Sequence, residues 1–319
     1  MTGSAPNPFQ EISSDFWNQY IKGRPPLAES LLQRIWSYHA SHGGLFNLLH
    51  EPGAGAGVHS RRFATKFQKV IVSDISPSNI TAAKSHLQDL SNITFRVGPL
   101  EDYSGIEKES VDMILAINCI HWTDIDKALE SVQHQLKPGG TFVSILFCHS
   151  VLKDPRAQEL WLKISWRTLA SVWEKDGVPR GEQPLWLKKV VSGGNALPFP
   201  ETVFEPGVKR VRINYEKDFF PAYVPEEDEK AFERLPDQFG KSDEIVSEKD
   251  EVDWGIKADV KRLKEMMDAV VPLEGDEDID GLWKEFRDVV GDREMEGTVP
   301  VSCILATKRR NARDVNGVH

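Results

Sequence analysis

Three glycines occupy alternate positions, Gly53, Gly55 and Gly57, directly after a short apolar segment and an acid. Glycine lacks a Cβ and adopts positive φ at little cost, so this spacing allows a tight turn and a close approach of the backbone to a ligand. Between a strand and a helix, such a loop presents backbone N–H groups and the positive end of a helix dipole, which is typical of a nucleotide site. A glycine-rich turn before a surface helix is the alternative interpretation.

Glu51, two residues before the first glycine, indicates which nucleotide the loop could bind. The dinucleotide fingerprint G-x-G-x-x-G needs a glycine at its sixth position, where this chain has Val58. A carboxylate also repels phosphate oxygens at short range, whereas it attracts an ammonium group. The loop therefore favours an adenosine that carries an amino acid, and an NAD-dependent oxidoreductase is the competing hypothesis.

Asp74 ends a β-branched segment and lies 17 residues after Gly57. Continuous apolar segments of this length fit a strand that is buried on both faces. An acid at the carboxyl end of the second strand of a strand–loop–helix–strand unit can accept hydrogen bonds from both ribose hydroxyls. Asp74 is thus a second candidate binding residue, although it suits NAD and other adenosine ligands equally.

Apolar segments alternate with helical segments through residues 41–150. This alternation predicts an α/β fold, a Rossmann-like, doubly wound and mostly parallel sheet with helices on both faces. Such sheets bind ligands at the carboxyl ends of their strands, where we expect the loops at residues 98–102 and 118–122. The later strands are expected at residues 93–97, 111–117 and 141–147, with a helix at 124–136.

Five motifs, in order along the chain, resemble those of the class I S-adenosylmethionine-dependent methyltransferases. They are Glu-x-Gly-x-Gly-x-Gly at 51–57, Asp74, Gly-Pro-Leu-Glu-Asp at 98–102, His121 with Trp122, and Leu-Lys-Pro-Gly-Gly at 136–140. Residues 20–25, 205–210 and 303–308, together with His121 and Trp122, resemble the branch of fungal trans-aconitate and cantharidin-type methyltransferases. The resemblance covers residues 15–150 well and implies a seven-stranded sheet.

The resemblance implies S-adenosylmethionine as the cofactor and assigns roles to several residues. Glu51 would bind the methionine ammonium, Asp74 the ribose hydroxyls, and Leu100 and Glu101 the adenine. The backbone of Asn118 would line the methionine moiety, and His121, beside the path of transfer, is the candidate catalytic residue. The expected cofactor-binding residues are Tyr20, Arg24, Glu51, Gly53, Gly55, Gly57, Asp74, Ile75, Leu100, Glu101 and Asn118. Pro99 departs from the polar residue of many relatives, which puts adenine contacts there in doubt.

Residues 152–189 carry four tryptophans on one or two expected amphipathic helices. A density of large rings suits a cap over a small-molecule pocket, and it equally suits packing of that cap onto the sheet. The expected acceptor-binding residues are Trp122, Trp161, Arg167 and Arg210.

The possible methyl acceptors differ in whether the reacting oxygen must first lose a proton. A hydroxyl or phenol must lose a proton and needs a general base, for which His121 is the candidate. A carboxylate is already ionised and needs cationic donors instead, of which Arg24, Arg167 and Arg210 are candidates, with Tyr20 as a hydroxyl donor. We expect carboxyl O-methylation of a small organic acid. The alternatives are hydroxyl methylation, and a methyltransferase-fold binding protein or pericyclase-like enzyme without methyl transfer.

Composition limits the partners. The 319 residues carry a formal net charge of −10, which argues against a general nucleic-acid or acidic membrane surface. Cys119, Cys148 and Cys303 are expected to be buried, reduced thiols, and no spacing suggests a metal site. No apolar run has the length of a membrane span and residues 1–10 lack a secretory signal, so we expect a cytoplasmic monomer or homodimer.

We expect the chain to form a single elaborated domain with five parts. These are a helical lid (1–40), the cofactor-binding core (41–150), a tryptophan-rich helical cap (151–200), C-terminal strands with an acidic helical insert that complete the core (201–310), and a disordered tail (311–319).

Overall fold

The computed structural model describes residues 14–147, 149–175, 177–178, 182–215, 233–269 and 276–310. The predictions for Cys148, for the tail at 311–319 and for the first thirteen residues of the lid lie outside these ranges, as does the side chain of Trp173.

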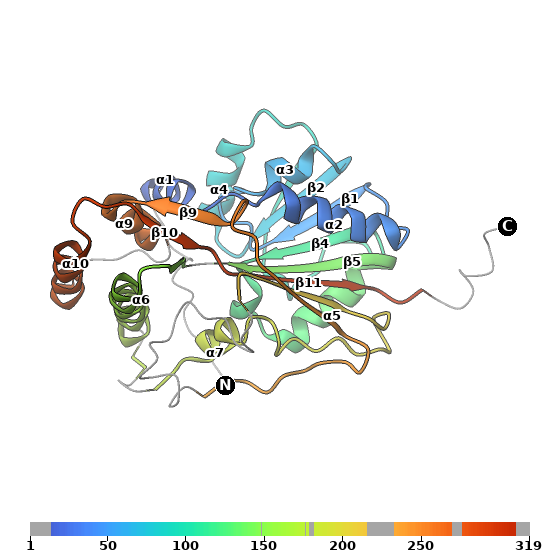
Figure 1. Ribbon diagram of the computed structural model, residues 1–319. Coiled ribbons are helices and arrows are strands. Elements are labelled where there is room, and N and C mark those ends of the chain that lie inside the picture. Colours follow the sequence, from blue (N-terminus) through green and yellow to red (C-terminus); the bar gives the residue numbers. More distant parts are fainter. Residues whose placement is uncertain are drawn as a thin grey trace.

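A large sheet of eight strands forms the centre of the fold, in the order β3-β2-β1-β4-β5-β11-β7-β8 (Figure 1). The strands from β3 to β5 run parallel, whereas β11 is antiparallel to both β5 and β7. This arrangement confirms the predicted Rossmann-like, mostly parallel fold. The strands are β1 (Leu48–Pro52), β2 (Lys69–Asp74), β3 (Ile93–Val97), β4 (Val111–Ile117), β5 (Leu136–Phe147), β7 (Lys209–Ile213), β8 (Glu244–Glu248) and β11 (Val301–Thr307).

The expected number of seven strands is wrong, because β8 adds an eighth strand at the edge of the sheet. β8 pairs in parallel with β7, but its sequence, Glu-Ile-Val-Ser-Glu, has few apolar residues, and most of its side chains are exposed. An edge strand pairs on one side only and needs little apolar surface. The sequence of β8 therefore resembled that of a solvated, acidic insert.

Helices cover both faces of the parallel strands. Leu49 and Met113 pack into one core with α2 (Glu29–Ser41), α3 (Ser60–Ala64) and α4 (Pro77–His86), while Ile114 packs into the opposite core with α5 (Ile125–Gln135). Successive residues of a strand point to opposite faces, so a strand covered on both sides is mostly apolar. All seven residues of β4 are buried accordingly.

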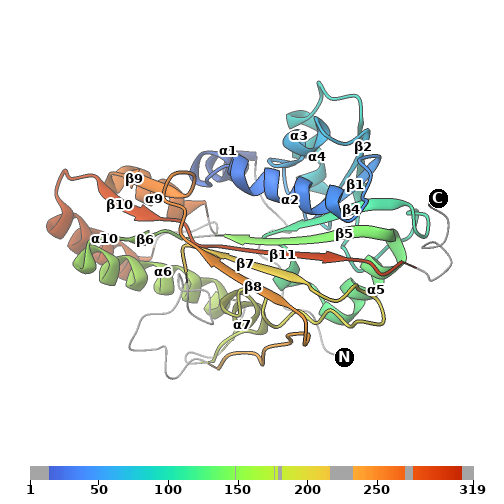
Figure 2. The same ribbon diagram turned by 45° about the vertical axis from the view of Figure 1, so that its right-hand side comes forward.

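The cap is larger than the predicted helical cap and contains a second, three-stranded sheet in the order β6-β10-β9. Trp161, Trp283 and Phe286 are fully buried in its own apolar core. Figures 1 and 2 both place this cap beyond one end of the large sheet. Its elements are β6 (Val151–Leu152), α6 (Pro155–Lys175), α7 (Leu185–Val191), β9 (Gly255–Ala258), α9 (Val260–Asp268), α10 (Glu277–Val290) and β10 (Met295–Thr298).

The N-terminal helix α1 (Ser14–Gly23) lies against α9 of the cap (Figure 1). A Cβ at Gly23 would lie 2.4 Å from the carbonyl oxygen of Glu265, so the two helices approach closely at this glycine. The helix is therefore held by the cap, at the side of the sheet where the strands end.

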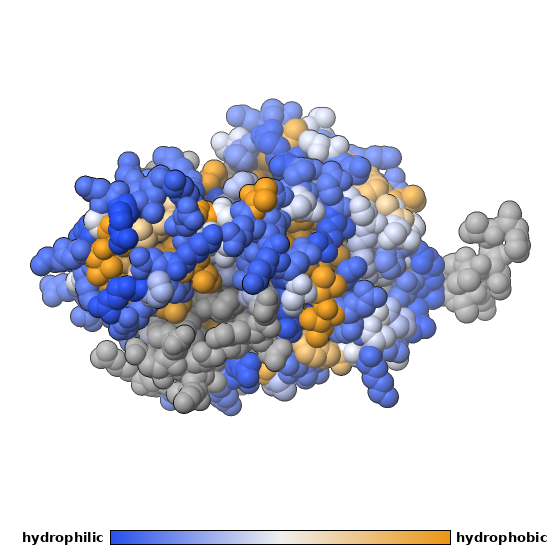
Figure 3. Space-filling model, in the orientation of Figure 1, coloured by the Kyte–Doolittle hydropathy of each residue, from blue (hydrophilic) through white to orange (hydrophobic). Residues whose placement is uncertain are grey.

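No helix in the described ranges is both long and apolar enough to cross a bilayer. Hydrophilic residues cover most of the face in Figure 3, and the hydrophobic residues on it form small separate groups.

Candidate active site

A pocket opens at the carboxyl ends of β1, β2 and β4, beneath α1 and beside the cap. Ten of the eleven expected cofactor-binding residues line it. The exception is Gly57, whose φ is +71° and where a Cβ would lie 2.6 Å from Leu87, so this glycine serves the turn itself.

Gly53 and Gly55 both adopt positive φ, +63° and +56°. A Cβ at Gly53 would lie 2.5 Å from the Cβ of Cys119, and one at Gly55 would lie 2.4 Å from the ring of Trp17. Glycine is thus required here both for conformation and for space. The loop fits closely between the end of β4 and the helix α1.

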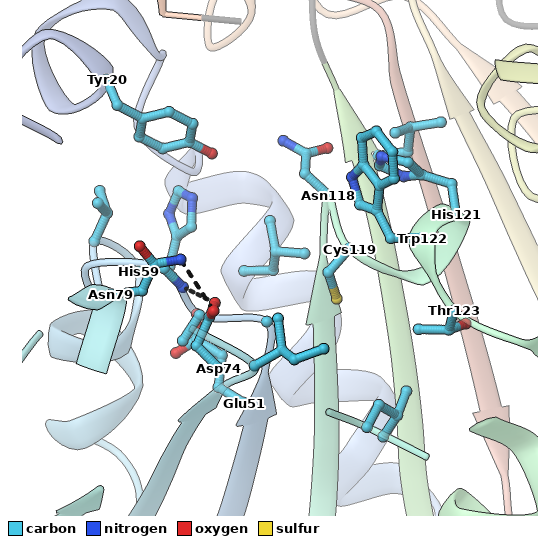
Figure 4. A pocket seen from close by; sticks show the side chains of 18 of the residues that line it. Tyr20, Glu51, His59, Asp74, Asn79, Asn118, Cys119, His121, Trp122 and Thr123 are labelled. Carbon is cyan, nitrogen blue, oxygen red and sulfur yellow. Dashed lines mark hydrogen bonds between the residues drawn. The ribbon is translucent and has the colours of Figure 1, made fainter. Parts of the chain in front are cut away.

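Two buried acids form one side of the pocket (Figure 4). Glu51 is 1% exposed and accepts a hydrogen bond of 2.6 Å from Ser60 Oγ, and burial raises its pKa to about 7. Asp74 accepts hydrogen bonds from Gly55 N and Ser76 N, both at 2.9 Å, and burial raises its pKa as well. Its third donor is Asn79 Nδ2 at 3.0 Å. A buried carboxylate with a raised pKa is stabilised by a cation, so Glu51 suits the ammonium group of an amino acid.

Asn118 adopts the left-handed conformation at the end of β4, with φ of +49°. Its Oδ1 accepts a hydrogen bond of 3.0 Å from Phe147 N, and its buried Nδ2 has no hydrogen-bond partner among the described residues. Figure 4 shows the amide at the centre of the pocket. Backbone strain and an unused donor at one position are typical of a binding site.

Cys119 and His121, two residues apart, lie in opposite electrostatic surroundings. Burial raises the pKa of the Cys119 thiol, and the negative charges of Asp74, Glu51 and Glu101 raise it further. Burial lowers the pKa of His121 to about 3, and the positive charges of Lys189 and Arg24 add to this effect.

His121 lies on the short helix η1 (Ile120–Trp122) and is 9% exposed. Its Nδ1 has no hydrogen-bond partner in the described part of the chain, where no carboxylate orients the ring. The adjacent Trp122 stacks on Trp186 of α7, with ring centroids 4.8 Å apart. This end of the pocket is therefore aromatic and apolar, with a neutral imidazole at its wall.

Tyr20 and Arg24 bring α1 to the pocket. The Arg24 guanidinium lies over the Tyr20 ring, with Cζ 5.1 Å from the ring centroid, and its Nη1 lies 3.4 Å from the carbonyl oxygen of Phe147. Of the three arginines expected as candidates for holding a carboxylate, Arg24 is the one that lines the pocket.

Trp161 and Arg167 do not line the pocket, contrary to the sequence-based expectation. Trp161 is fully buried in the core of the cap, where its Nε1 donates to the carbonyl oxygen of Ser150 at 2.8 Å. Arg167 forms ion pairs of 2.9 Å with Glu174 and 2.8 Å with Asp276. Both residues hold the cap together.

Arg210 is also outside the pocket. It is 3% exposed on β7, forms an ion pair of 2.7 Å with Asp243, and donates to the carbonyl oxygens of Gly194 and Leu197 at 3.0 Å. Its donors are used to fix neighbouring loops.

Several pocket residues escaped the sequence analysis. His59, in the glycine loop, is buried with its pKa lowered to about 4 by burial and by Arg24, and its Nε2 has no partner among the described residues. Asn79 bonds both Asp74 and Trp17 Nε1, at 3.0 and 3.1 Å, and so connects α1 to the ribose candidate. His59 follows the glycines of the loop and Asn79 follows Asp74 in the sequence, and this proximity to the binding motifs is the signal that could have identified them.

Comparison with known proteins agrees with this geometry. Residues 50–144 match the family described as "Methyltransferase domain". The chain is 32% identical to Methyltransferase AacuQ of Aspergillus aculeatus over 92% of this chain and 93% of that protein. It is 33% identical to Methyltransferase gedG of Aspergillus terreus, with 92% of each chain covered. A solved structure from Anaeromyxobacter dehalogenans, described as a candidate type II methyltransferase, has the same fold, with a TM-score of 0.55 at 17% identity over 90% of this chain and 99% of that one. The chain therefore belongs to the class I S-adenosylmethionine-dependent methyltransferases.

Proposed function

We propose that this methyltransferase transfers a methyl group to a carboxylate oxygen of a small organic acid. The finer resemblance to trans-aconitate and cantharidin-type methyltransferases is part of this proposal. S-adenosylmethionine, when bound, supplies an electrophilic methyl group on a sulfonium. The residues of the chain then act mainly by binding and orienting the two reactants, which is the larger part of catalysis for an in-line displacement.

The acidic side of the pocket would hold the donor. Glu51 would bind its ammonium group and Asp74 its ribose hydroxyls, with Leu100 and Glu101 near the adenine. Tyr20 and Arg24 would cover the site from α1. The raised pKa of Glu51 and the unpartnered Nδ2 of Asn118 support this placement, because both call for a polar ligand.

The sign of the electrostatic field at His121 carries the proposal of an anionic acceptor. Lys189 and Arg24 act on the imidazole with positive charge, which disfavours an imidazolium and favours a carboxylate at the same place. A neutral His121 can donate one N–H to that carboxylate. Trp122, stacked on Trp186, would form the apolar wall and exclude water.

The pH dependence of kcat tests this proposal against hydroxyl methylation. A carboxylate acceptor is ionised throughout neutral pH, so the profile should be flat between about pH 6 and 9, and His121→Gln should cause only a modest loss of rate. An ascending limb that His121→Gln abolishes, with kcat lowered by about 10² to 10⁴, would mean that His121 is a general base for a hydroxyl. Unchanged affinity for S-adenosylhomocysteine in the variant is the required control.

A further inference from the structure

Four buried polar side chains connect the middle of the sheet to the loop that follows β3. Ser73 Oγ lies 2.7 Å from His50 Nε2, and His50 Nδ1 lies 2.7 Å from Gln135 Oε1. Gln135 Nε2 lies 2.8 Å from Ser131 Oγ, which lies 2.5 Å from the carbonyl oxygen of Leu100. We call these four residues the His50 network. All four are 0% exposed, between the sheet and α5, where apolar side chains are usual.

The carbonyl oxygen of Leu100 fixes the direction of three of the four bonds in the network. A carbonyl oxygen only accepts, so the Ser131 hydroxyl donates to it and must itself accept from the amide nitrogen of Gln135. The amide oxygen of Gln135 then faces His50, so His50 Nδ1 carries the proton.

The direction of the remaining bond, between His50 and Ser73, depends on the protonation of His50. If His50 is neutral, Nε2 is a bare acceptor and receives the hydroxyl proton of Ser73. Burial lowers the pKa of His50 to about 4, in agreement with a neutral ring. Every donor in the network is therefore used in one direction, and bonds aligned in this way strengthen one another.

The network touches three segments that line the pocket. His50 directly precedes Glu51 on β1, Ser73 directly precedes Asp74 on β2, and Leu100 lines the pocket itself. Backbone bonds join the same segments at their ends: Ala54 N donates to Ser73 O at 3.0 Å, and Gly98 N donates to Asp74 O at 2.9 Å. The spacing between the two acids and the loop at 98–102 is thus fixed from inside the sheet.

We propose that the residues of the His50 network are positioning residues, which hold the loop at Leu100 and Glu101 in register with Glu51 and Asp74 for the adenosine part of the donor. This inference rests on the proposed donor site. It adds that the binding geometry depends on hydrogen bonds from α5, a helix that does not itself line the pocket.

The tautomer of His50 tests the direction of the network without any ligand. In the ¹⁵N-labelled protein, nitrogen–proton correlation spectra should show a protonated Nδ1 and a bare Nε2 for His50 between about pH 6 and 8. Assignment follows from loss of the signals in His50→Asn. A protonated Nε2, or an imidazolium, would overturn the proposed direction.

Ser131→Ala tests the positioning role, because it removes only the last bond and leaves Leu100 O without its donor. Calorimetry should show weaker binding of both S-adenosylhomocysteine and adenosine, each by about three- to tenfold, which is the size of one neutral hydrogen bond. Ser131→Thr keeps the hydroxyl and should restore binding. Ser165→Ala is the matched control, a buried helical serine of the cap whose hydroxyl has no partner among the described residues.

The outcomes are distinguishable. Equal affinities of folded Ser131→Ala and the wild type would overturn the positioning role, as would a loss of thermal stability without a change in either dissociation constant. Failure of the wild type itself to bind S-adenosylhomocysteine would overturn the proposed donor site and, with it, this role for the network.

Discussion

The two ends of the pocket differ in charge and in the part of the fold that builds them. The end beside Cys119 carries Glu51 and Asp74, at the ends of β1 and β2, and Glu101, on the loop after β3. The end beside His121 is lined by Trp122 and by Trp186 of α7, and the positive charge of Lys189 acts on His121 from outside this lining. The pocket thus has acids where the sheet forms it and an apolar lining where the cap covers it, with the positive charges of Arg24 and Lys189 acting on His121.

This difference indicates how one cavity could hold two ligands of opposite charge. Charges of opposite sign act within two residues of each other, at Cys119 and at His121, so a cationic donor and the proposed anionic acceptor would be favoured at different places in the pocket.

Asp74→Ala should have the largest effect. It would remove the two charge-assisted hydrogen bonds that we propose to the ribose, each worth about 1.5 to 3 kcal/mol, so affinity for S-adenosylhomocysteine should fall at least about tenfold by calorimetry. Asp276→Ala is the matched control, because Asp276 also accepts from two backbone N–H groups and one side chain, but in the cap. Unchanged affinity for S-adenosylhomocysteine in folded Asp74→Ala would mean that Asp74 does not bind the ribose.

Glu51→Gln should affect binding and stability in opposite directions. Burial raises the pKa of Glu51 from 4.5 to about 7, so the folded protein binds this proton more tightly than the unfolded chain does, and stability falls as pH rises through this range. The variant should therefore raise the free energy of unfolding at pH 8 by about 1 to 3 kcal/mol.

The same variant should weaken binding of S-adenosylhomocysteine about tenfold at pH 8, because the ammonium group loses its partner. In the wild type, affinity should rise from pH 6 to 8 as Glu51 ionises, whereas the variant should show no such rise. A wild-type affinity that is independent of pH in this range would separate Glu51 from the ammonium.

Lys189→Met tests the acceptor end. Removing this charge should raise KM for an acidic acceptor by about three- to thirtyfold and leave affinity for S-adenosylhomocysteine unchanged. The neighbouring Lys188→Met is the control, because Lys188 pairs with Glu233 and is not among the charges that lower the pKa of His121. Equal KM values for the two variants would contradict a positive acceptor end.

Arg167→Met should have the smallest effect. Its ion pairs lie within the cap and are partly exposed, so we expect a loss of about 0.5 to 1 kcal/mol in unfolding free energy and no change in acceptor KM. A raised KM for the acceptor in this variant would mean that Arg167 takes part in acceptor binding.

The sequence predicted the donor end far better than the acceptor end, for a physical reason. The glycine loop, Asp74 and the alternation of strands and helices are local patterns, whose meaning depends on a few adjacent residues. The topology of a parallel sheet then brings these loops to one edge. The lining of the pocket by Glu51, Gly53 and Leu100 follows from these rules.

The acceptor end depends on contacts between distant residues. Arg167 pairs with an acid 109 positions away, and Lys189 bonds the carbonyl oxygen of Thr123 across 66 positions. No local pattern shows which arginine meets an acid in the cap and which side chain reaches the pocket. Trp161 illustrates the same limit, because a large ring suits a cap core and a pocket wall equally.

The chemical nature of the methylated product tests the central claim most directly. The enzyme would be incubated with S-adenosylmethionine labelled in its methyl group and with pairs of acids and their matching primary alcohols, and the products would be treated with mild alkali. The account predicts that the acids are labelled and that alkali releases the label as volatile methanol, because methyl esters hydrolyse where methyl ethers do not. Label that resists alkali, or that appears on the alcohols alone, would contradict it.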